Sequence, residues 1–415
     1  MAMLDRPGVG ARRAAIFALA LWREQGTFPT RALATAPDHA FALELTGCVL
    51  RHKASLEWLL KRCANRLPGG ELWAALMVGA AQLFHLPAIA DYAAIAETVE
   101  AAKPLGKGAV GFVNAILRRL QRERVPLLEA LSAAPEPLRR DIPPRLWTRW
   151  VDAFGLARTR KLAEAMALPP RVYLRPLPPH PAPETCEPCT EDPKGSFAVP
   201  RGCRVNALPG FAEGHFVVQD PATRHAIELL DIRPGQAVLD LCAAPGGKTA
   251  QIAARLFAGG DTRGTLVANE VSPERLETLR DTLTRCGFAE HVRLTAVDGT
   301  QVAAALPGET FDRILLDVPC SNTGVLGRRA DARWGWSVRK LEALCQTQTA
   351  LLEACAPLLR PGGRLVYSTC SIEPEEDAQQ VERFLAKHPA WHCAEARLIL
   401  PEAGHDGAYA ALLTR

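Results

Sequence analysis

The sequence predicts an all-α N-terminal region followed by an α/β region with a doubly wound, mostly parallel sheet. Apolar residues recur at spacings of three and four through residues 10–130, which is the period of an amphipathic helix. From about Phe216, short apolar segments alternate with helical stretches, a pattern typical of a parallel sheet. At 415 residues the chain also exceeds what one hydrophobic core usually fills, so at least two domains are expected.

The helical region contains three apolar stretches and one strongly amphipathic segment. The three stretches are Ala14–Leu21, Leu43–Leu60 and Leu72–Leu86. The amphipathic segment, Val110–Leu120, is followed by a cluster of basic residues that begins within it: Arg118, Arg119, Arg122 and Arg124. This cluster suits both the negative end of a helix dipole and contact with phosphate, and the sequence does not decide between the two.

Charge is unevenly distributed along the chain. Net charge is +4, but residues 1–125 carry 16 Lys and Arg against 10 Asp and Glu, an excess of six, which leaves −2 for residues 126–415. A mildly basic first domain fits a polyanionic partner such as nucleic acid.

The middle of the chain is less regular. Residues 130–175 have a weak helical pattern, and residues 176–200 are rich in proline and polar residues, so we expect a linker or irregular surface segment without packed secondary structure. This segment contains Cys186 and Cys189, but a structural zinc site needs four ligands and no second Cys-x-x-Cys pair follows, so no metal is expected. We predict three regions: a helical domain over 1–130, a connector and Pro/Cys-rich linker over 131–210, and an α/β domain over 211–415.

Nothing in the sequence resembles a membrane span or an export signal. The longest early apolar run, Ala14–Trp22, is far shorter than the ~20 residues that cross a bilayer, and Arg23 and Glu24 follow it. The 12 cysteines show no disulfide framework, which indicates free thiols in a reducing compartment. We expect a cytoplasmic monomer with no membrane contact.

A Gly-rich turn after the first predicted strand is the clearest ligand signal. Ala237–Thr249 (AVLDLCAAPGGKT) runs from a buried strand into Gly246 and Gly247 and then into a helix, where backbone amides can face a ligand. A P-loop would need glycine at position 242, which is Cys242, so that pattern fails. The dinucleotide pattern Gly-x-Gly-x-x-Gly is also absent, which argues against NAD.

Acidic residues follow four successive predicted strands. The predicted strands are Ala237–Leu241, Thr265–Ala268, Arg293–Val297, Arg313–Leu316 and Arg364–Tyr367. The acidic residues at the ends of the first four are Asp240, Glu270, Asp298 and Asp317. Any one of them could simply cap a strand end. Together, at the edge where such sheets bind ligands, they predict an adenosine-type ligand, because carboxylates accept hydrogen bonds from ribose hydroxyls and an adenine amino group.

Two cysteines lie just after predicted strands in polar turns. They are Cys320 in LLDVPCSNTG (315–324) and Cys370 in VYSTCS (366–371), and both are candidate nucleophiles. Cys345 and Cys355, on a predicted helix, are expected to act as small hydrophobic residues instead. The residues alone do not rank Cys320 against Cys370.

Several motifs in order resemble one enzyme family. DLCAAPGGKT (240–249), LLDVPCSNTG, DARW (331–334) and YSTCSIEPEE (367–376) together resemble the RNA cytosine-5 methyltransferases, and within them the RsmB or Sun group that modifies 16S ribosomal RNA. Residues 1–130 resemble that group's NusB-like RNA-binding domain, notably in AETVEAAK (96–103) and GFVNAILR (111–118). GHDG (404–407) also fits the group.

The resemblance implies a fold, a cofactor and a set of site residues. The fold would be a NusB-like helical domain followed by a Rossmann-like class I methyltransferase domain, and the cofactor S-adenosylmethionine. Cys370 would be the nucleophile that attacks carbon 6 of cytosine, Cys320 would assist product release, and Asp317 would bind the ring edge. Cofactor contacts would fall on Cys242, Ala243, Ala244, Pro245, Gly246, Gly247, Lys248, Glu270, Asp298 and Asp317.

Two aspects stay open at this point. The Pro319-Cys320 pair resembles the nucleophile motif of DNA cytosine-5 methyltransferases, which would exchange the roles of the two cysteines. The partner is expected to be RNA, and small-subunit ribosomal RNA is the first candidate substrate. Transfer RNA as substrate, or a non-catalytic RNA-binding or assembly role, are the alternatives because function lies in the site and not in the fold.

Overall fold

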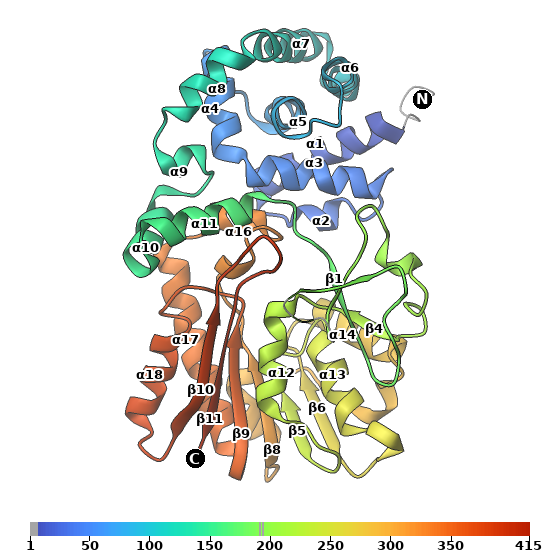
Figure 1. Ribbon diagram of the computed structural model, residues 1–415, viewed down its shortest axis with the longest axis vertical. Helices are drawn as coiled ribbons and strands as arrows, with labels where there is room; N and C mark the ends of the chain where they lie inside the picture. Colours follow the sequence, from blue (N-terminus) through green and yellow to red (C-terminus); the bar gives the residue numbers. More distant parts are fainter. Residues whose placement is uncertain (1–6, 191, 193–194) are drawn as a thin grey trace. The chain divides into compact units, whose positions relative to one another are not determined.

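The computed structural model describes residues 7–190, 192 and 195–415 (Figure 1). Residues 1–6 of the predicted helical domain, and residues 191 and 193–194 of the predicted linker, lie outside the described part. The chain forms two compact units: one runs up to Pro169 and includes Gly327–Gly335, and the other comprises Pro170–Leu326 and Trp336–Arg415. None of the helices formed by the described residues is long and apolar enough to cross a membrane.

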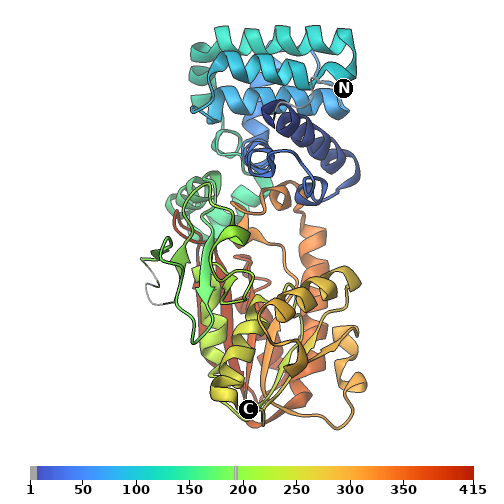
Figure 2. The same cartoon turned by 90° about the vertical axis from the view of Figure 1, so that its right-hand side faces the viewer.

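The first unit is built from helices, which confirms the predicted all-α region. Its helices are α1 (Pro7–Gln25), α2 (Pro29–Ala32), α3 (His39–Arg51), α4 (Lys53–Cys63), α5 (Gly70–His85), α6 (Asp91–Ala101), α7 (Lys107–Arg122), α8 (Arg124–Ser132), α9 (Glu136–Arg139), α10 (Pro144–Phe154), α11 (Leu156–Ala167) and α16 (Ala330–Gly335). The stretch Leu43–Leu60 forms two helices, because the chain leaves helical geometry at His52 (φ −116°, ψ 24°). Helix α5 is buried over Trp73–Leu83, and α6 and α7 run beside it (Figure 2).

Helix α16 belongs to this helical unit although its sequence lies between β8 and β9 of the α/β region. The buried Arg333 guanidinium donates to the backbone carbonyls of Arg51, Asp141 and Met166 at 3.2, 3.0 and 3.0 Å. Trp334 adds a hydrogen bond from Nε1 to the Leu50 carbonyl at 2.7 Å. Because carbonyls at helix ends have no intrahelical partner, one arginine here satisfies acceptors from three separate segments.

The second unit is centred on a seven-stranded sheet. Its strands are β5 (Ala237–Asp240), β6 (Thr265–Asn269), β7 (Val292–Thr295), β8 (Phe311–Asp317), β9 (Leu359–Thr369), β10 (His392–Ile399) and β11 (Ala408–Thr414). The order is β10-β11-β9-β8-β5-β6-β7, parallel from β9 to β7, with β11 and β10 antiparallel at the edge. The predicted doubly wound, mostly parallel sheet is therefore confirmed.

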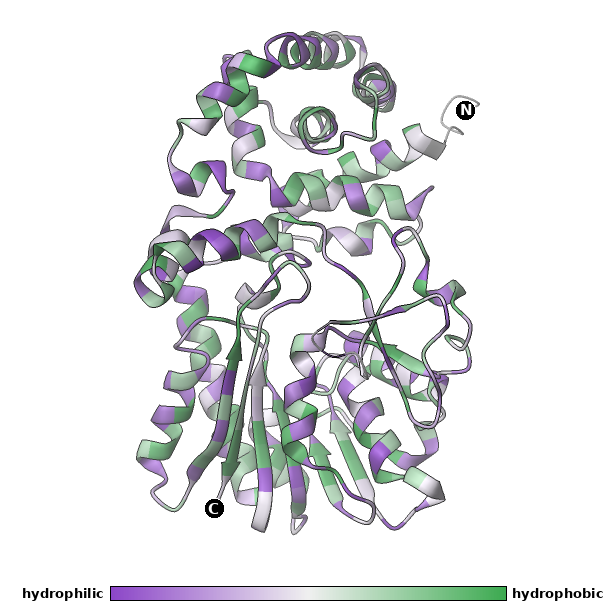
Figure 3. Ribbon diagram, viewed as in Figure 1, coloured by the Kyte–Doolittle hydropathy of each residue, from purple (hydrophilic) through white to green (hydrophobic). Residues whose placement is uncertain are grey.

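Helices cover both faces of this sheet. One apolar layer joins it to α12 (Arg224–Leu230), α13 (Gly247–Leu256) and α14 (Pro273–Arg285), and the other to α15 (Val302–Ala305), α17 (Val338–Cys355) and α18 (Ala378–Lys387). Neighbouring strand residues alternate between the layers, as Val238 and Leu239 do in β5. The central strands are accordingly apolar in Figure 3, whereas the helices mix apolar and polar residues. Burial on both faces explains why these strands appear in the sequence as continuous apolar runs.

A second, smaller sheet corrects one expectation. The segment expected to lack packed secondary structure instead contributes two short strands to a four-stranded antiparallel sheet: β1 (Tyr173–Pro176), β2 (Glu187–Pro188), β3 (Phe197–Ala198) and β4 (Phe216–Val218). Cys186 and Cys189 are buried in two different apolar clusters of this sheet. No group of three or more His, Cys, Asp or Glu side chains able to hold a metal occurs among the residues that the structure describes. The two cysteines therefore pack as small apolar side chains.

Candidate active site

The carboxyl ends of β8, β5, β6 and β7 meet at one edge of the large sheet, because these strands are parallel neighbours. The four acidic residues singled out in the sequence lie there: Asp317, Asp240, Glu270 and Asp298. The topology thus brings together residues that are up to 77 positions apart in the chain.

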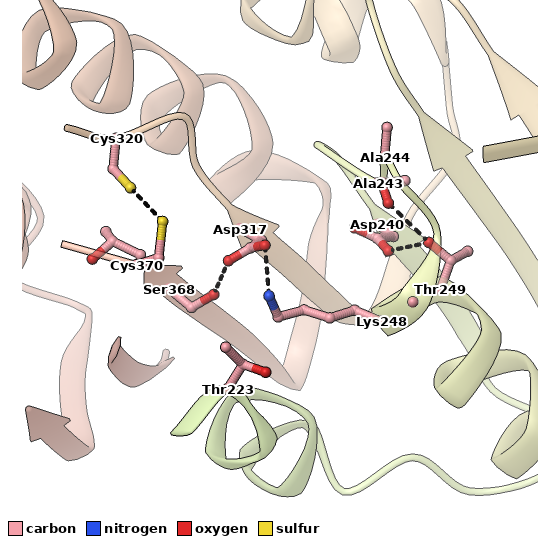
Figure 4. Close-up of polar contacts among 12 residues, drawn as sticks. Thr223, Asp240, Ala243, Ala244, Lys248, Thr249, Asp317, Cys320, Ser368 and Cys370 are labelled. Carbon is pink, nitrogen blue, oxygen red and sulfur yellow. Dashed lines mark hydrogen bonds and ion pairs between the residues drawn. The ribbon is translucent and has the colours of Figure 1, made fainter. Parts of the chain in front are cut away.

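Asp240, the last residue of β5, holds the Gly-rich turn through one carboxylate oxygen and leaves the other unpaired. Thr249 Oγ1 donates to Asp240 Oδ2 at 2.7 Å (Figure 4). Asp240 Oδ1 is buried and has no hydrogen-bond partner among the described residues. Burial raises the pKa of Asp240 to about 7. The Thr249 hydrogen bond opposes this shift, and the charge of Asp317 adds to it. A buried oxygen without a donor marks a place where a ligand can bind.

Asp240 lines a cavity of about 200 Å³. Its lining residues come from β4, the segment after β4, the Gly-rich turn and β8: Val218, Gln219, Asp220, Thr223, Asp240, Cys242, Ala243, Ala244, Pro245, Gly247, Lys248 and Asp317. Gly246 shapes the turn, since its φ of +102° disfavours other residues and a Cβ there would lie 2.9 Å from Leu279. Burial and the charge of Asp240 raise the pKa of Cys242, so this cysteine lines the cavity as a neutral thiol.

Glu270 and Asp298 lie farther along the same sheet edge and do not line this cavity. Glu270 directly follows β6, is buried, and accepts a hydrogen bond from the Ser272 amide at 3.0 Å. Asp298 is exposed and caps a short helical turn by accepting from the Thr300 amide at 2.9 Å. Glu270 is still linked to the Gly-rich turn, because Arg275 lies 3.4 Å from its carboxylate and donates to the Ala244 carbonyl at 2.8 Å.

An ion pair connects the Gly-rich turn to β8. Lys248 Nζ donates to Asp317 Oδ2 at 2.7 Å, and Ser368 of β9 donates to Asp317 Oδ1 at 2.5 Å (Figure 4). Burial alone would lower the pKa of Lys248, but the Asp317 carboxylate outweighs it and the pKa is raised. Lys248 is therefore a cation held on a carboxylate.

A second cavity, of about 140 Å³, lies on the other side of this ion pair. Its lining combines α12, the ends of β8 and β9, and the edge strands: Ala222, Thr223, His225, Ala226, Lys248, Asp317, Ser368, Thr369, Cys370, Arg397, Ile399, Ala408, Tyr409 and Ala410. It shares Thr223, Lys248 and Asp317 with the first cavity. The two cavities are thus neighbours, and the Lys248–Asp317 pair stands between them.

The two candidate nucleophiles are adjacent in space. Cys320 and Cys370 are free thiols whose Sγ atoms lie 3.1 Å apart (Figure 4). Their loops follow β8 and β9, which are parallel neighbours. Cys370 lines the second cavity and Cys320 lines neither of the two. Asn322, whose φ of +61° lies in the left-handed region that asparagine tolerates, accepts from Cys370 Sγ through Oδ1 at 3.3 Å and donates to the Cys320 carbonyl at 3.0 Å.

The surroundings of the two sulfurs differ in charge. The hydrogen bond with Cys370, burial, and the charges of Cys370 and Glu376 together raise the pKa of Cys320 well above its ordinary value. Lys248 shares a cavity with Cys370, and the charges of these two groups interact. The Lys248–Asp317 ion pair therefore shares a cavity with Cys370, while the charge of Glu376 acts on Cys320. Cys355, expected to be a core residue, is fully buried, whereas Cys345, for which the same was expected, is only partly buried and donates to the Glu375 carbonyl at 3.4 Å.

The site combines three features: a Gly-rich turn that leads from a strand into a helix, a carboxylate with an unpaired oxygen beside that turn, and acidic residues after neighbouring strands. These features suit a ligand with an ammonium group and ribose hydroxyls. S-adenosylmethionine carries both, and with this sheet the site defines a class I S-adenosylmethionine-dependent methyltransferase. A model of the family described as 16S rRNA methyltransferase RsmB/F matches residues 227–409, and a NusB family model matches residues 10–122. The chain belongs to the RsmB/F family of methyltransferases, joined to a NusB-like helical domain.

Full-length relatives support this assignment. A ribosomal RNA small subunit methyltransferase B of Xanthomonas campestris pv. campestris is 36% identical over 399 residues, spanning 92% of this chain and 88% of the relative. A probable ribosomal RNA small subunit methyltransferase B of Synechocystis sp. is 33% identical over 405 residues, spanning 91% and 87%. The crystal structure of PH0851 has the same fold, with a TM-score of 0.80 at 21% identity over 98% of this chain and 99% of that one.

Some site residues escaped the sequence analysis. Thr223 and Arg397 line the second cavity, yet Thr223 precedes a short helix without any motif and Arg397 lies on an edge strand. Ser368 could have been found, since it lies two residues before Cys370 in the YSTC motif. A serine there gains a role only once β8 and β9 are known to be neighbours.

The arginine cluster near the end of α7 divides into two kinds. Arg124 donates to the Leu83 carbonyl and to Asp91, both at 2.7 Å, and Arg119 bonds Glu123 at 3.0 Å. These two stabilise the helical unit. The side chain of Arg122 is 70% exposed, and that of Arg118 is also exposed. The side chain of Arg119 is 45% exposed as well, so Arg118, Arg119 and Arg122 form the part of the cluster available to a partner.

Proposed function

We propose that the protein methylates carbon 5 of a cytosine in 16S ribosomal RNA through a covalent Cys370–cytosine intermediate. The observation that carries this proposal is the pair of free cysteines, 3.1 Å apart, of which one lines the cavity that adjoins the cofactor turn. The names of the full-length relatives, ribosomal RNA small subunit methyltransferase B, support small-subunit ribosomal RNA as the substrate. Cytoplasmic location and a monomeric state stay predictions.

The cofactor is assigned to the first cavity. Asp240 Oδ1 would accept a hydrogen bond from the ammonium group of its methionine part, and Glu270 and Asp298, farther along the edge, would accept from the ribose and adenine. S-adenosylmethionine, when bound, supplies a methyl group on a positively charged sulfur. Lys248 and Asp317 separate this site from the cavity of Cys370, so donor and acceptor meet beside the ion pair.

Cys370 is the better nucleophile of the two cysteines. It lines the cavity that also holds Lys248 and Asp317, whereas Cys320 lines neither cavity, so Cys370 is the cysteine that an incoming base can reach. Its thiolate is the attacking species. The thiolate forms a bond to carbon 6 of cytosine, and an electron pair of the ring moves to carbon 5. That carbon then has the electron density to take the methyl group, which the unmodified ring lacks.

Asp317 and Lys248 act on the ring edge. The Asp317 carboxylate, held by Lys248 and Ser368, can accept a hydrogen bond from the cytosine amino group or from protonated nitrogen 3, and so favours electron flow into the ring. Because both partners of Asp317 are fixed by the turn and by β9, the carboxylate is oriented before the substrate arrives. The cytosine must leave its base stack to reach this cavity, so a single-stranded or flipped target is expected.

Cys320 assists release of the product. After methylation, the proton on carbon 5 must leave, and the electron pair of that bond expels the Cys370 sulfur as a thiolate. While Cys370 is bonded to carbon, its hydrogen bond and its charge no longer raise the pKa of Cys320. Cys320, as a thiolate or through a water that it orients, can then take the proton as a general base.

The test is methyl transfer from labelled S-adenosylmethionine to unmodified 16S ribosomal RNA, followed by nucleoside analysis of the RNA. The expected result is label in 5-methylcytidine at one position. If label appears in 5-methylcytidine only when transfer RNA is supplied, the proposed reaction is retained and transfer RNA is the substrate. RNA binding with no label in either RNA, although the cofactor binds, would contradict the proposed enzyme and favour a non-catalytic RNA-binding protein. A partially assembled small subunit is included as a third acceptor.

A further inference from the structure

A fully buried carboxylate lies behind the two cysteines. Glu376 follows β9 in a turn, and both of its oxygens accept hydrogen bonds. Oε1 accepts from the Ser321 amide and from Gln348 Nε2, each at 2.9 Å. Oε2 accepts from Ser371 Oγ at 2.5 Å and also from the hydroxyl of Ser321. Ser321 directly follows Cys320, and Ser371 directly follows Cys370, so one carboxylate holds both loops.

Further bonds join the same two loops. The Gly324 amide donates to the Cys370 carbonyl at 3.0 Å, and the Ile372 amide donates to Thr323 Oγ1 at 3.1 Å. The hydroxyls of Thr323 and Ser371 lie 3.1 Å apart. Gln348 of α17, which donates to Glu376, also donates to the Pro319 carbonyl at 3.0 Å, just before Cys320. Glu376 is the centre of this network because it is the member that touches both loops and α17.

A buried charge of this kind is costly unless its hydrogen bonds are made. Among the described residues, no lysine, arginine or histidine forms an ion pair with Glu376. Four donors, three of them in the cysteine loops, offset the loss of water instead. Displacing either loop would remove one or two of the four donors from the carboxylate, so the network resists changes in loop position.

We propose that Glu376 is a positioning residue that joins the Cys320 loop to the Cys370 loop and thereby sets the separation of the two sulfurs. The purpose of this arrangement rests on the proposed function, in which the cysteine that forms the bond and the cysteine that assists release must both reach the same cytosine. Glu376 lines neither cavity, so it acts through the loops and not by contact with cofactor or base.

Disulfide capture measures the separation of the sulfurs without RNA. Diamide oxidises two neighbouring thiols to a disulfide: the thiols lose two protons and two electrons, and diamide is reduced to the corresponding hydrazine. The full-length protein is treated with diamide, quenched by alkylation, and the Cys320–Cys370 disulfide is followed by peptide mass spectrometry. Glu376→Gln is compared with the wild type and with Glu375→Gln, which removes the same charge from the neighbouring residue.

The expected result is a rate about tenfold or more slower in Glu376→Gln, and an unchanged rate in Glu375→Gln. The direction of the change in oxidation rate distinguishes an effect on loop geometry from an effect of the lost charge. Loss of the Glu376 charge alone removes one cause of the raised pKa of Cys320, increases its thiolate fraction and would speed oxidation. A rate in Glu376→Gln equal to or faster than that of the wild type would overturn the proposal.

Glu376→Asp is the control for the case in which Glu376→Gln simply fails to fold. It keeps the carboxylate but shortens its reach, so a rate between those of wild type and Glu376→Gln is expected. S-adenosylmethionine affinity, measured by calorimetry, should be unchanged in all variants, because Glu376 lies outside the cofactor cavity. Equal loss of cofactor binding and disulfide rate in both Glu376 variants would show a general structural role and contradict the proposal. Since no RNA is used, this result stands apart from whether the wild type methylates ribosomal RNA.

Discussion

The loops that follow β8 and β9 have the same design but different electrostatic surroundings. Each leaves a buried parallel strand, and each carries a cysteine followed by a serine that bonds Glu376. Cys370 opens onto a cavity that also contains Lys248, whereas Cys320 lies behind it under the influence of the Glu376 carboxylate. Two similar sequence motifs thus become chemically different through residues distant in sequence, Lys248 lying more than a hundred positions from Cys370.

This difference favours one assignment of roles over its reverse. A thiolate is stabilised by a nearby cation and destabilised by a nearby anion. The proline before Cys320 resembles the nucleophile motif of another enzyme class, but of the two cysteines it is Cys370 that lines the cavity beside Lys248. The following substitutions test this contrast, from the largest expected effect to the smallest.

Replacing Cys370 by alanine should have the largest effect on activity. Without the sulfur that bonds carbon 6, methyl transfer should fall by about 10⁴-fold or more, because the whole covalent route is lost. Single-turnover transfer of labelled methyl groups to the RNA measures this. Cofactor affinity should be unchanged, since Cys370 does not line the first cavity. Full activity in this variant would refute the assignment of the nucleophile.

Replacing Cys320 by alanine should lower turnover by about 10²- to 10⁴-fold, the range of general-base catalysis, while leaving bond formation intact. An RNA–protein adduct should then accumulate that survives denaturation but not proteolysis, as seen by gel electrophoresis with labelled RNA. If Cys370→Ala accumulates the adduct and Cys320→Ala does not, the roles are reversed and the electrostatic contrast between the loops has been misinterpreted.

Asp240 offers a pH test away from both sulfurs. Its pKa of about 7 leaves the carboxyl neutral below and anionic above that pH, and only the anion attracts the cofactor's ammonium group. Between pH 6 and 7.5, S-adenosylmethionine affinity should rise by up to about tenfold in the wild type and stay flat in Asp240→Asn. Calorimetric titration at several pH values measures it. A flat wild-type profile would remove Asp240 from the cofactor site.

The same group should affect stability in the opposite sense. A carboxyl whose pKa rises from about 3.9 in the unfolded chain to about 7 in the fold binds its proton more tightly when folded. Its contribution to stability is complete below about pH 4 and is lost as the pH rises through 7. The pH that favours cofactor binding is therefore the pH at which Asp240 contributes least to the stability of the empty fold.

The smallest effect is expected at Arg122. This exposed arginine should contact RNA phosphate if the helical unit binds the substrate, so Arg122→Ala should weaken RNA binding a few-fold and reduce the slope of log affinity against log salt by about one. Filter binding across salt concentrations measures both. Neither cysteine step should change in single-turnover assays, which makes this variant the control for the loop contrast. An unchanged salt slope would remove Arg122 from the RNA interface.

The repeating elements were predictable, because helices and buried strands leave periodic apolar patterns. The edge strands were not: β10 is mostly exposed and has a mixed sequence, so its pairing with β11 depends on tertiary context. The strands β2 and β3 are two residues long and lie in a Pro-rich segment, where composition indicates a loop. Local patterns fail where an element is fixed mainly by its neighbours.

The site was predictable in its residues but not in its contacts. Both cysteines, Asp317 and the Gly-rich turn could be named from the sequence, and their roles remain to be tested. Glu376 was visible as the last letter of YSTCSIEPEE, but nothing in that motif shows that its carboxylate reaches Ser321 of another loop. Such contacts depend on the order of the strands in the sheet, which the sequence of a single segment does not predict.

Helix α16 has a consequence for synthesis on the ribosome. Domains of a growing chain usually fold in order, N-terminal first. The helical unit cannot follow that order completely, because Arg333, which satisfies the carbonyls of Arg51, Asp141 and Met166, is made only after strands β5 to β8 of the large sheet. The nascent helical bundle must therefore wait for a residue encoded after the Cys320 loop. This contact can form once Arg333 has been made, before β9, the Cys370 loop, β10 and β11 follow.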